Sequence, residues 1–212
     1  MVAIAGSLSN ESMRKRRMRP SRRPCRTTPS CLAYHRPMDE PDAATDATTP
    51  ALQAVIAAGV PHRVVRTERA SSAEESARFQ GIETRQLLRT IVVRRGDDDY
   101  LFVLVPAGRR FDWPKLRALL EVRRMSLPDA DEARAVTGYE RYTITPFGST
   151  RPWPVIADET IADEPVVAIG GGGFGINLHL APTDLVRALD ARVADVSVPE
   201  PPHDHDHPGG HP

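Results

Sequence analysis

The sequence predicts an α+β domain with a curved, mixed or mostly antiparallel β-sheet and helices around it. Two observations predict this class. Apolar runs at residues 90–93 and 100–105 flank a turn rich in Gly and Asp, which predicts a hairpin. Further short apolar runs are interspersed with amphipathic segments, without the regular strand–helix repeat of a doubly wound fold. The 212 residues allow one such domain with extensions.

The first predicted helix begins at Thr49, a capping residue followed by Pro50, and it ends at Gly59. Ser72 and Glu75 have the spacing of a capping box and predict the start of a second helix, closed near residue 81. The other expected elements, in chain order, are strands at 61–66, 90–93 and 100–105, helices from 112 and at 131–136, strands at 154–157, 166–169 and 176–180, a helix at 182–189 and a strand at 193–196.

Composition divides the chain into three parts. Residues 1–48 are expected to be disordered, basic up to residue 37 and acidic after it, and Met38 is the expected first residue of the natural protein. A transit peptide and a basic interaction arm are the alternatives for this leader. Residues 49–198 are the expected folded domain, and residues 199–212 an expected disordered tail rich in His and Pro.

The charge distribution limits the classes of function. The chain is formally neutral, but residues 1–37 carry nine Lys or Arg and one acid, so the rest is acidic. An acidic domain argues against general coating of nucleic acid, although it allows a local phosphate site. Both cysteines, Cys25 and Cys31, lie in the leader, which leaves no thiol for catalysis in the domain. No apolar stretch is long enough to span a membrane, and we expect a cytoplasmic protein.

A literal G-x-G-x-x-G at Gly170, Gly172 and Gly175 raises the question of a dinucleotide site. Such a site needs a helix after the glycines, because helix N–H groups hold the pyrophosphate. Here residues 176–180 alternate between apolar and polar, which predicts a strand. The sequence therefore predicts two strands joined by a tight glycine turn that a ligand can approach closely, and no nucleotide cofactor.

Four of the seven histidines lie in the tail PHDHDHPGGHP. Alternating His could bind a divalent metal, but nothing in the tail fixes a geometry, so a loose adventitious site is expected. A metal-handling or interaction role through the leader and tail is kept as a third class of function. No metal site is predicted in the domain.

Four segments in order, SSAEESARFQGIETRQLLRTIVV, YLFVLVPAGRRFDWPKLRALL, TGYERYTITPFG and GGGGFGINLHLAPTDLVRAL, resemble the YbaK/EbsC family. This family includes the editing domain of bacterial prolyl-tRNA synthetases and its free-standing relatives, and the resemblance covers residues 49–196. It implies hydrolysis of the ester of a mischarged aminoacyl-tRNA, with no metal or organic cofactor. Editing is needed because a synthetase pocket cannot reject a smaller amino acid well.

The resemblance implies a substrate cleft with glycines on one wall. Arg89 stands where family members usually carry a Lys that holds the polar and phosphate groups of the substrate, and Thr90 follows it. Arg keeps the charge and can bind phosphate with two hydrogen bonds. Gly171, Gly172 and Gly175 are expected to line the cleft, where the aminoacyl end of tRNA would lie against bare backbone.

The second wall, residues 138–148, departs from the family pattern Gly-Tyr-x-x-Gly-Gly-x-Ser-Pro-x-Gly. Tyr142 and Thr143 replace the two middle glycines, and Thr145 replaces Ser. We expect Thr143 to present its backbone N–H to the reacting carbonyl if its φ suits a β-branched residue. Tyr142 could narrow the pocket to a small side chain or block it. Asn177, from the first wall, replaces an Asp of some relatives. The expected substrate-binding residues are Thr90, Tyr142, Thr145, Pro146, Gly148, Gly171, Gly175 and Asn177.

These observations predict a stand-alone trans-editing aminoacyl-tRNA deacylase that removes a small amino acid from mischarged tRNA, with tRNA(Pro) as a candidate carrier. Arg89, Thr143 and Gly172 are the predicted catalytic residues. The alternative is a catalytically decayed binding module of the same fold, which would sense tRNA or a small amino-acid derivative. The acceptor end of aminoacyl-tRNA is the expected partner, and association with an aminoacyl-tRNA synthetase is a further expectation. The sequence does not set the oligomeric state.

Overall fold

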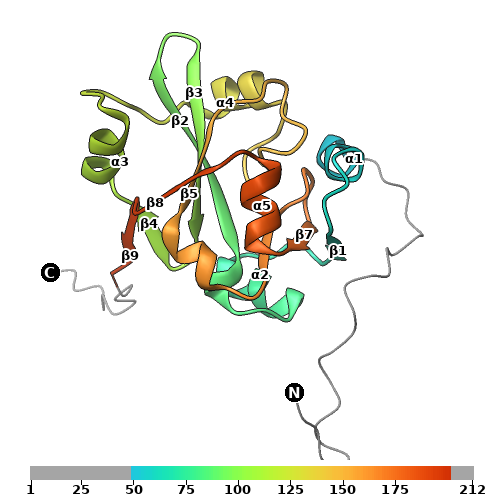
Figure 1. Ribbon diagram of the computed structural model, residues 1–212. Coiled ribbons are helices and arrows are strands. Elements are labelled where there is room, and N and C mark those ends of the chain that lie inside the picture. Colours follow the sequence, from blue (N-terminus) through green and yellow to red (C-terminus); the bar gives the residue numbers. More distant parts are fainter. Residues whose placement is uncertain (1–48, 202–212) are drawn as a thin grey trace, which may run out of the picture. The chain divides into compact units, whose positions relative to one another are not determined.

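The computed structural model describes residues 49–201, which form an α+β domain as predicted (Figure 1). The expectations for the leader, for Met38 and for the tail from residue 202 lie outside these residues. The elements in chain order are α1 (Pro50–Ala57), β1 (Arg63–Arg66), α2 (Ala73–Gln80), η1 (Thr84–Gln86), β2 (Leu88–Gly96), β3 (Asp99–Pro106), β4 (Arg109–Phe111), α3 (Trp113–Leu120), α4 (Ala130–Thr137), β5 (Val155–Asp158), η2 (Glu159–Asp163), β6 (Val167–Gly170), β7 (Ile176–Leu180), α5 (Pro182–Ala188), β8 (Arg192–Ala194) and β9 (Ser197–Pro199).

The strands form three hydrogen-bonded sheets, with the orders β1-β7-β6, β2-β3-β5-β8 and β4-β9. Strand β5 runs parallel to β3 and to β8, and the other pairs are antiparallel, so the strand pairing is mixed and mostly antiparallel as predicted. A parallel bridge between Leu87 and Ala168 joins the start of β2 to β6. The first two sheets therefore meet where β2 begins.

Two apolar cores lie on opposite faces of β2 and β3, because neighbouring residues of a strand point to opposite sides. Leu88, Val92 and their neighbours on β3 pack with α1, α5, β6 and β7 in the larger core. Val93 and the alternate residues of β3 pack in a smaller core against α3. Figure 1 shows α3 on one side of the β2–β3 hairpin and α1 and α5 on the other.

The predicted helix caps form as the sequence indicates. The Thr49 hydroxyl accepts a hydrogen bond from the Leu52 N–H, and the Asp112 carboxylate accepts one from the Lys115 N–H. The Ser72 hydroxyl caps α2 by accepting a hydrogen bond from the Glu75 N–H. The Glu75 carboxylate accepts from the Ser71 N–H, whereas a full capping box would have it accept from the Ser72 N–H. Among the described helices, none combines the length and apolar composition needed to cross a bilayer.

The strand expected at residues 193–196 is split between two pairings. β8 ends at Ala194 beside β5, and β9 pairs with β4, an edge strand that the sequence does not signal because three residues show no alternation. The N–H of Glu200 then donates to the carbonyl of Gly108. Residues 199 and 200 thus belong to the folded domain, although the sequence assigns them to the tail.

Candidate active site

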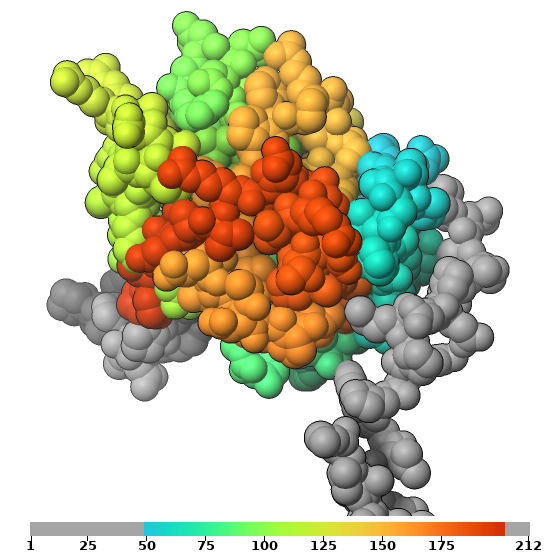
Figure 2. Space-filling model, in the orientation of Figure 1, coloured from blue at the N-terminus to red at the C-terminus, as the bar shows by residue number. Residues whose placement is uncertain are grey.

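Two loops and the start of α1 meet in the larger core. The first loop, residues 170–175, is called the glycine turn, and the second, residues 138–148, is called the Tyr139 loop. The Thr49 hydroxyl donates to the Gly171 carbonyl with an O···O distance of 2.6 Å. On the Tyr139 loop, Gly148 has φ +65°, and a Cβ there would lie 2.4 Å from the Pro50 carbonyl oxygen. In Figure 2 the atoms of α1 (cyan) abut those of the segment that follows residue 145 (light orange).

The Tyr139 ring joins the two loops. Its hydroxyl donates to the Phe147 carbonyl at 2.7 Å, which closes the Tyr139 loop on itself. A Cβ on Gly172 would lie 2.7 Å from the ring, so only glycine allows this approach. Burial raises the pKa of Tyr139 to about 12, and the phenol therefore stays protonated at neutral pH as a structural donor.

The glycine turn presents several free backbone donors. Two hydrogen bonds close the turn. The Gly171 N–H donates to the Ile176 carbonyl at 2.8 Å, and the Ile176 N–H donates to the Gly173 carbonyl. Within residues 49–201, none of the four N–H groups of residues 172–175 donates a hydrogen bond. Gly172 and Gly175 have φ of +81° and +70°. Successive free N–H groups of this kind can bind an anion or polarise a carbonyl.

The Thr143 N–H is not among these free donors. It donates to Glu140 O at 3.0 Å, and the Thr143 hydroxyl donates to the same carbonyl at 2.9 Å. The turn at residues 140–143 therefore uses this N–H internally, and the role expected for it at a reacting carbonyl stays a prediction that requires this hydrogen bond to be exchanged. Thr143 itself has an ordinary negative φ, whereas Tyr142 has φ +72°, the left-handed conformation of a glycine position.

The Tyr142 side chain does not enter the space between the loops. It is 79% exposed, and the Arg141 guanidinium lies 5.1 Å from the centre of its ring. Thr145, further along the same loop, is fully buried, and its hydroxyl has no hydrogen-bond partner among the described residues. The Thr90 hydroxyl is also buried without a partner. Both hydroxyls are groups that a bound ligand or water can satisfy.

The register of the strands places Arg89 on the same face of the sheet as Gly170 and Asn177. Leu87 and Ala168 are bridged and point to one face, and alternation puts Arg89 and Gly170 on that face as well. Gly170 pairs with Asn177 across β6 and β7. A Cβ on Gly170 would lie 3.7 Å from the Ile144 carbonyl oxygen, so the Tyr139 loop passes over this face.

The Arg89 guanidinium itself is held at the β4–β9 edge. It donates to the Arg109 carbonyl and to the Glu200 carboxylate, the latter at 2.9 Å, and the side chain is 38% exposed. Its Nε is buried and has no partner within the described part of the chain. The structure thus brings together Gly148, Gly171, Gly172 and Thr143, and it does not bring the Arg89 guanidinium to them.

An open groove of about 730 Å³ adjoins the Tyr139 loop at Pro146 and Gly148. Most of its lining is apolar and comes from α1, from residues 152–156 and from the end of α5, and Arg95 and Arg192 also line it. The glycine turn does not line it. A second hollow, of about 570 Å³, lies against α2 and touches none of the predicted site residues.

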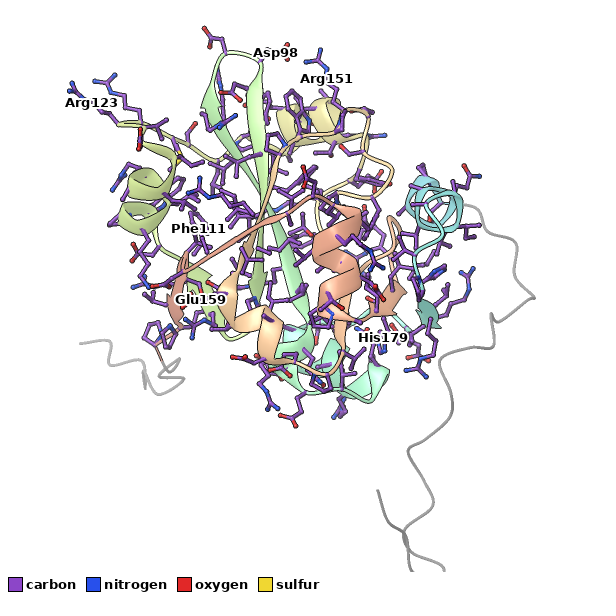
Figure 3. The ribbon with its side chains drawn as sticks, viewed as in Figure 1. Asp98, Phe111, Arg123, Arg151, Glu159 and His179 are labelled. Carbon is purple, nitrogen blue, oxygen red and sulfur yellow. The ribbon has the colours of Figure 1, made fainter. Side chains whose placement is uncertain are left out.

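His179, labelled in Figure 3 on β7, has a structural environment. Its Nδ1 lies 3.1 Å from the Arg63 guanidinium and its Nε2 lies 2.9 Å from the Gln80 amide oxygen. Because Arg63 can only donate, Nδ1 is the acceptor and Nε2 carries the proton. Burial, together with the Arg63 charge, lowers the pKa of His179 to about 4. Residues 49–201 contain no group of three metal-ligating side chains.

The family model of the aminoacyl-tRNA editing domain matches residues 67–188, a span that includes Arg89, the Tyr139 loop and the glycine turn. This span is more than half of the chain. The chain therefore belongs to the aminoacyl-tRNA editing domain family, as the sequence motifs indicate.

Individual relatives fall into two groups. EbsC of Enterococcus faecalis, described as a candidate Cys-tRNA(Pro)/Cys-tRNA(Cys) deacylase, is 23% identical over 129 residues, which are 61% of this chain and 79% of that protein. A proline–tRNA ligase of Lactobacillus helveticus is 24% identical over 141 residues, which are 65% of this chain. The match covers only 25% of the ligase, so this chain corresponds to one part of that enzyme.

Solved structures agree with this assignment. A candidate trans-editing enzyme for prolyl-tRNA synthetase has a TM-score of 0.66 at 25% identity, covering 74% of this chain and 99% of that chain. A structure described as a hypothetical protein has a TM-score of 0.65 at 23% identity, with coverage of 70% and 99%. The latter likeness supports the fold alone.

Sequence reasoning did not assign roles in the site to Thr49, Tyr139 or Glu200. Thr49 is visible in the sequence as a helix cap, but its hydrogen bond to Gly171 spans 122 residues and has no local signal. Tyr139 follows Gly138 as the family pattern requires, which is a signal that could have identified it. Nothing in the sequence indicates that Glu200 pairs with Arg89.

Proposed function

We propose that this chain is a stand-alone trans-editing deacylase that hydrolyses the ester of mischarged aminoacyl-tRNA. One observation carries the proposal most directly: a member of the editing family holds a glycine turn with free N–H groups at residues 172–175, fixed against Tyr139 and α1. An aminoacyl ester needs a positioned water, a polarised carbonyl and the exclusion of bulk solvent more than it needs a strong base.

In the proposed reaction, a water adds to the ester carbonyl carbon, and the oxyanion that forms accepts hydrogen bonds from N–H groups of residues 172–175. The bond between the carbonyl carbon and the ribose oxygen then breaks. The ribose oxygen takes the proton that the attacking water gives up, and free amino acid and tRNA are released. No metal or organic cofactor takes part in this proposal, and Gly172 is the residue on which it depends most.

The proposed substrate is a small amino acid on tRNA(Pro). The size limit is supported by the buried Tyr139, Thr143 and Thr145 side chains, which fill the inner side of the Tyr139 loop. The carrier is supported by the names of the relatives, which refer to Cys-tRNA(Pro) and to proline–tRNA ligase. Free charged tRNA as substrate would place the protein in the cytoplasm, where it could associate with a synthetase.

Two observations favour the second candidate function, a binding module that has lost hydrolysis. The Thr143 N–H is used inside its own turn, and Arg89 is engaged by Glu200. In the deacylase, Arg89 would have to exchange Glu200 for a phosphate or carbonyl of the substrate. In the binding module, this exchange would not occur or would not lead to turnover.

The test is a deacylation panel with the full chain and tRNA(Pro) charged with Ala, Ser, Cys or Pro. We expect hydrolysis of one or more of the small mischarged esters and none of Pro-tRNA(Pro). Gly172→Ala should abolish turnover, since its Cβ would meet the Tyr139 ring. Gly108→Ala is the matched control, because Gly108 has the same φ of +81° and nothing within 4 Å of an added Cβ. Binding of charged tRNA without any hydrolysis would establish the binding module instead.

A further inference from the structure

The tips of both site loops carry an exposed aromatic ring with an arginine over it. Phe174, at the tip of the glycine turn, is 45% exposed, and the Arg69 guanidinium lies 4.3 Å from its ring centre. Tyr142, on the Tyr139 loop, is 79% exposed under Arg141. Of the three exposed aromatic rings in residues 49–201, these two belong to the candidate site.

The two rings extend from neighbouring backbone. A Cβ added to Gly170, at the base of the glycine turn, would lie 3.9 Å from the Thr143 carbonyl oxygen and 3.7 Å from that of Ile144, the two residues that directly follow Tyr142. Tyr142 also holds its exposed position at φ +72°, a left-handed conformation that is strained for a non-glycine residue. Strain of this kind is typical of functional positions, and burial of the ring does not offset it here.

The arginines beside these rings are available to an anion. Arg69 and Arg141 form no ion pair with any residue in the described range, nor does Arg66 at the end of β1. Thr67, next to Arg66, donates its N–H to Gly175 O at 2.9 Å, which fixes this segment beside the glycine turn. Arg69 and the segment that contains Arg66 therefore lie beside the glycine turn, whereas Arg141 lies by Tyr142 on the Tyr139 loop.

The third exposed ring provides a contrast. Phe79, on α2, is 39% exposed and has Arg78 5.5 Å from its ring centre. Arg78 is paired with Glu75 at 3.4 Å, and neither residue lies on a site loop. An aromatic ring with an arginine over it is thus not by itself a feature of this site. The two pairs on the site loops differ from the Phe79 pair because their arginines form no ion pair with a described residue.

We propose that Phe174 with Arg69 and Tyr142 with Arg141 are stacking platforms for the unpaired nucleotides at the 3′ end of the tRNA acceptor stem. This inference rests on the proposed function, whose substrate ends in such a single strand. Aromatic side chains bind unpaired bases by stacking, regardless of sequence, and arginines beside them bind the intervening phosphates. Held in this way, the terminal ribose and its aminoacyl ester would enter between the loops at the glycine turn.

The test measures binding of uncharged tRNA(Pro) to the full chain by fluorescence anisotropy at one fixed salt concentration, since such binding depends strongly on salt. Two probes are compared: the intact tRNA and the same tRNA lacking its last three nucleotides. Phe174→Leu and Tyr142→Leu keep apolar bulk and lose the ring, and Phe79→Leu is the matched control. Thermal melts verify that all three variants are folded.

Each site variant should weaken binding of intact tRNA by about tenfold, the scale of one lost base stack, and leave the truncated tRNA unaffected. Phe79→Leu should change neither. Equal affinities of parent, Phe174→Leu and Tyr142→Leu for intact tRNA would overturn the inference, as would equal losses on both probes. If the parent also deacylates, the site variants should raise KM with little change in kcat.

The outcome for the proposed function is separate, because uncharged tRNA contains no ester. Loss of stacking in the variants together with an inactive parent would support the platforms and reject the deacylase. An active parent whose KM is the same in the variants would support the deacylase and reject the platforms.

Discussion

Substitution of Gly148 by Ala tests whether the Tyr139 loop and α1 must touch. The backbone of Gly148 is left-handed, at φ +65°, which costs an Ala residue about 1–2 kcal/mol. The new Cβ would also lie 2.4 Å from Pro50 O and 2.8 Å from Ala51 N. These are backbone atoms of the first turn of α1, so relief requires movement of the helix or of the loop. Overpacking of this kind costs about 1–3 kcal/mol.

Gly59→Ala is the control for this variant. Gly59 has a similar φ of +62°, but an added Cβ would find nothing within 4 Å. We therefore expect Gly148→Ala to lose about 2–5 kcal/mol of unfolding free energy and Gly59→Ala about 1–2 kcal/mol. For a domain of about 150 residues, each kcal/mol lowers Tm by roughly 2–4 °C. Any gain from a less flexible unfolded chain applies to both variants and cancels in the comparison.

The assay is urea denaturation of the full-length variants followed by circular dichroism, combined with kcat/KM for deacylation of Ala-, Ser- or Cys-tRNA(Pro). Equal losses of stability in Gly148→Ala and Gly59→Ala would refute the close approach of the loop to α1. A destabilised Gly148→Ala that keeps the parent's kcat/KM under conditions where it is fully folded would refute the placement of this contact in the site.

Three further outcomes are expected. Arg89→Ala should lower kcat/KM by about tenfold or more, the scale of a lost charge-assisted contact, whereas Glu200→Gln frees Arg89 and should keep or raise kcat/KM. Equal losses of kcat/KM in both variants would mean that the Arg89–Glu200 pair serves only to hold β9 in place. His179 binds a proton more weakly in the folded state, with a pKa of about 4, than in the unfolded chain, so stability should fall as pH decreases from 7 to 5. At pH 5, His179 should account for a loss of about 2 kcal/mol of unfolding free energy. The measurement compares the pH dependence of urea unfolding in the parent and in His179→Gln, and identical pH profiles would contradict this prediction. Deacylation should persist in excess chelator, and loss of activity that Zn²⁺ restores would reveal a metal site that the proposal lacks.

Local sequence signals predicted the secondary structure well where residue type acts on its own neighbours. Thr49, Ser72 and Asp112 cap helices because a short polar side chain reaches an N–H two or three residues ahead. The alternation in residues 176–180 predicted β7, a strand in the place where a dinucleotide site would have a helix. The short strands β4 and β9 gave no such signal, because three residues at a sheet edge are set by their partner strand.

The candidate site was predictable in its parts and not in its geometry. The order of motifs was enough to indicate the editing family, and it identified both loops. It could not indicate that Thr143 uses its N–H on Glu140, that the Tyr142 ring lies in solvent, or that Glu200 engages Arg89. These are choices among hydrogen-bond partners and rotamers, and each depends on which groups from distant segments arrive within about 3 Å.

The sequence by itself determined the fold class, the position of the glycines and the chemistry available to them, because these follow from residue type and local spacing. Only the tertiary structure decided which donors remain free. The turn whose N–H groups at residues 172–175 have no acceptor among the described residues is held in place by distant contacts: Thr49, from 122 residues earlier, binds the Gly171 carbonyl, and the Tyr139 ring leaves room for a glycine alone at position 172. Contacts between segments so far apart in the chain are set by packing of the whole core, and no local pattern encodes them.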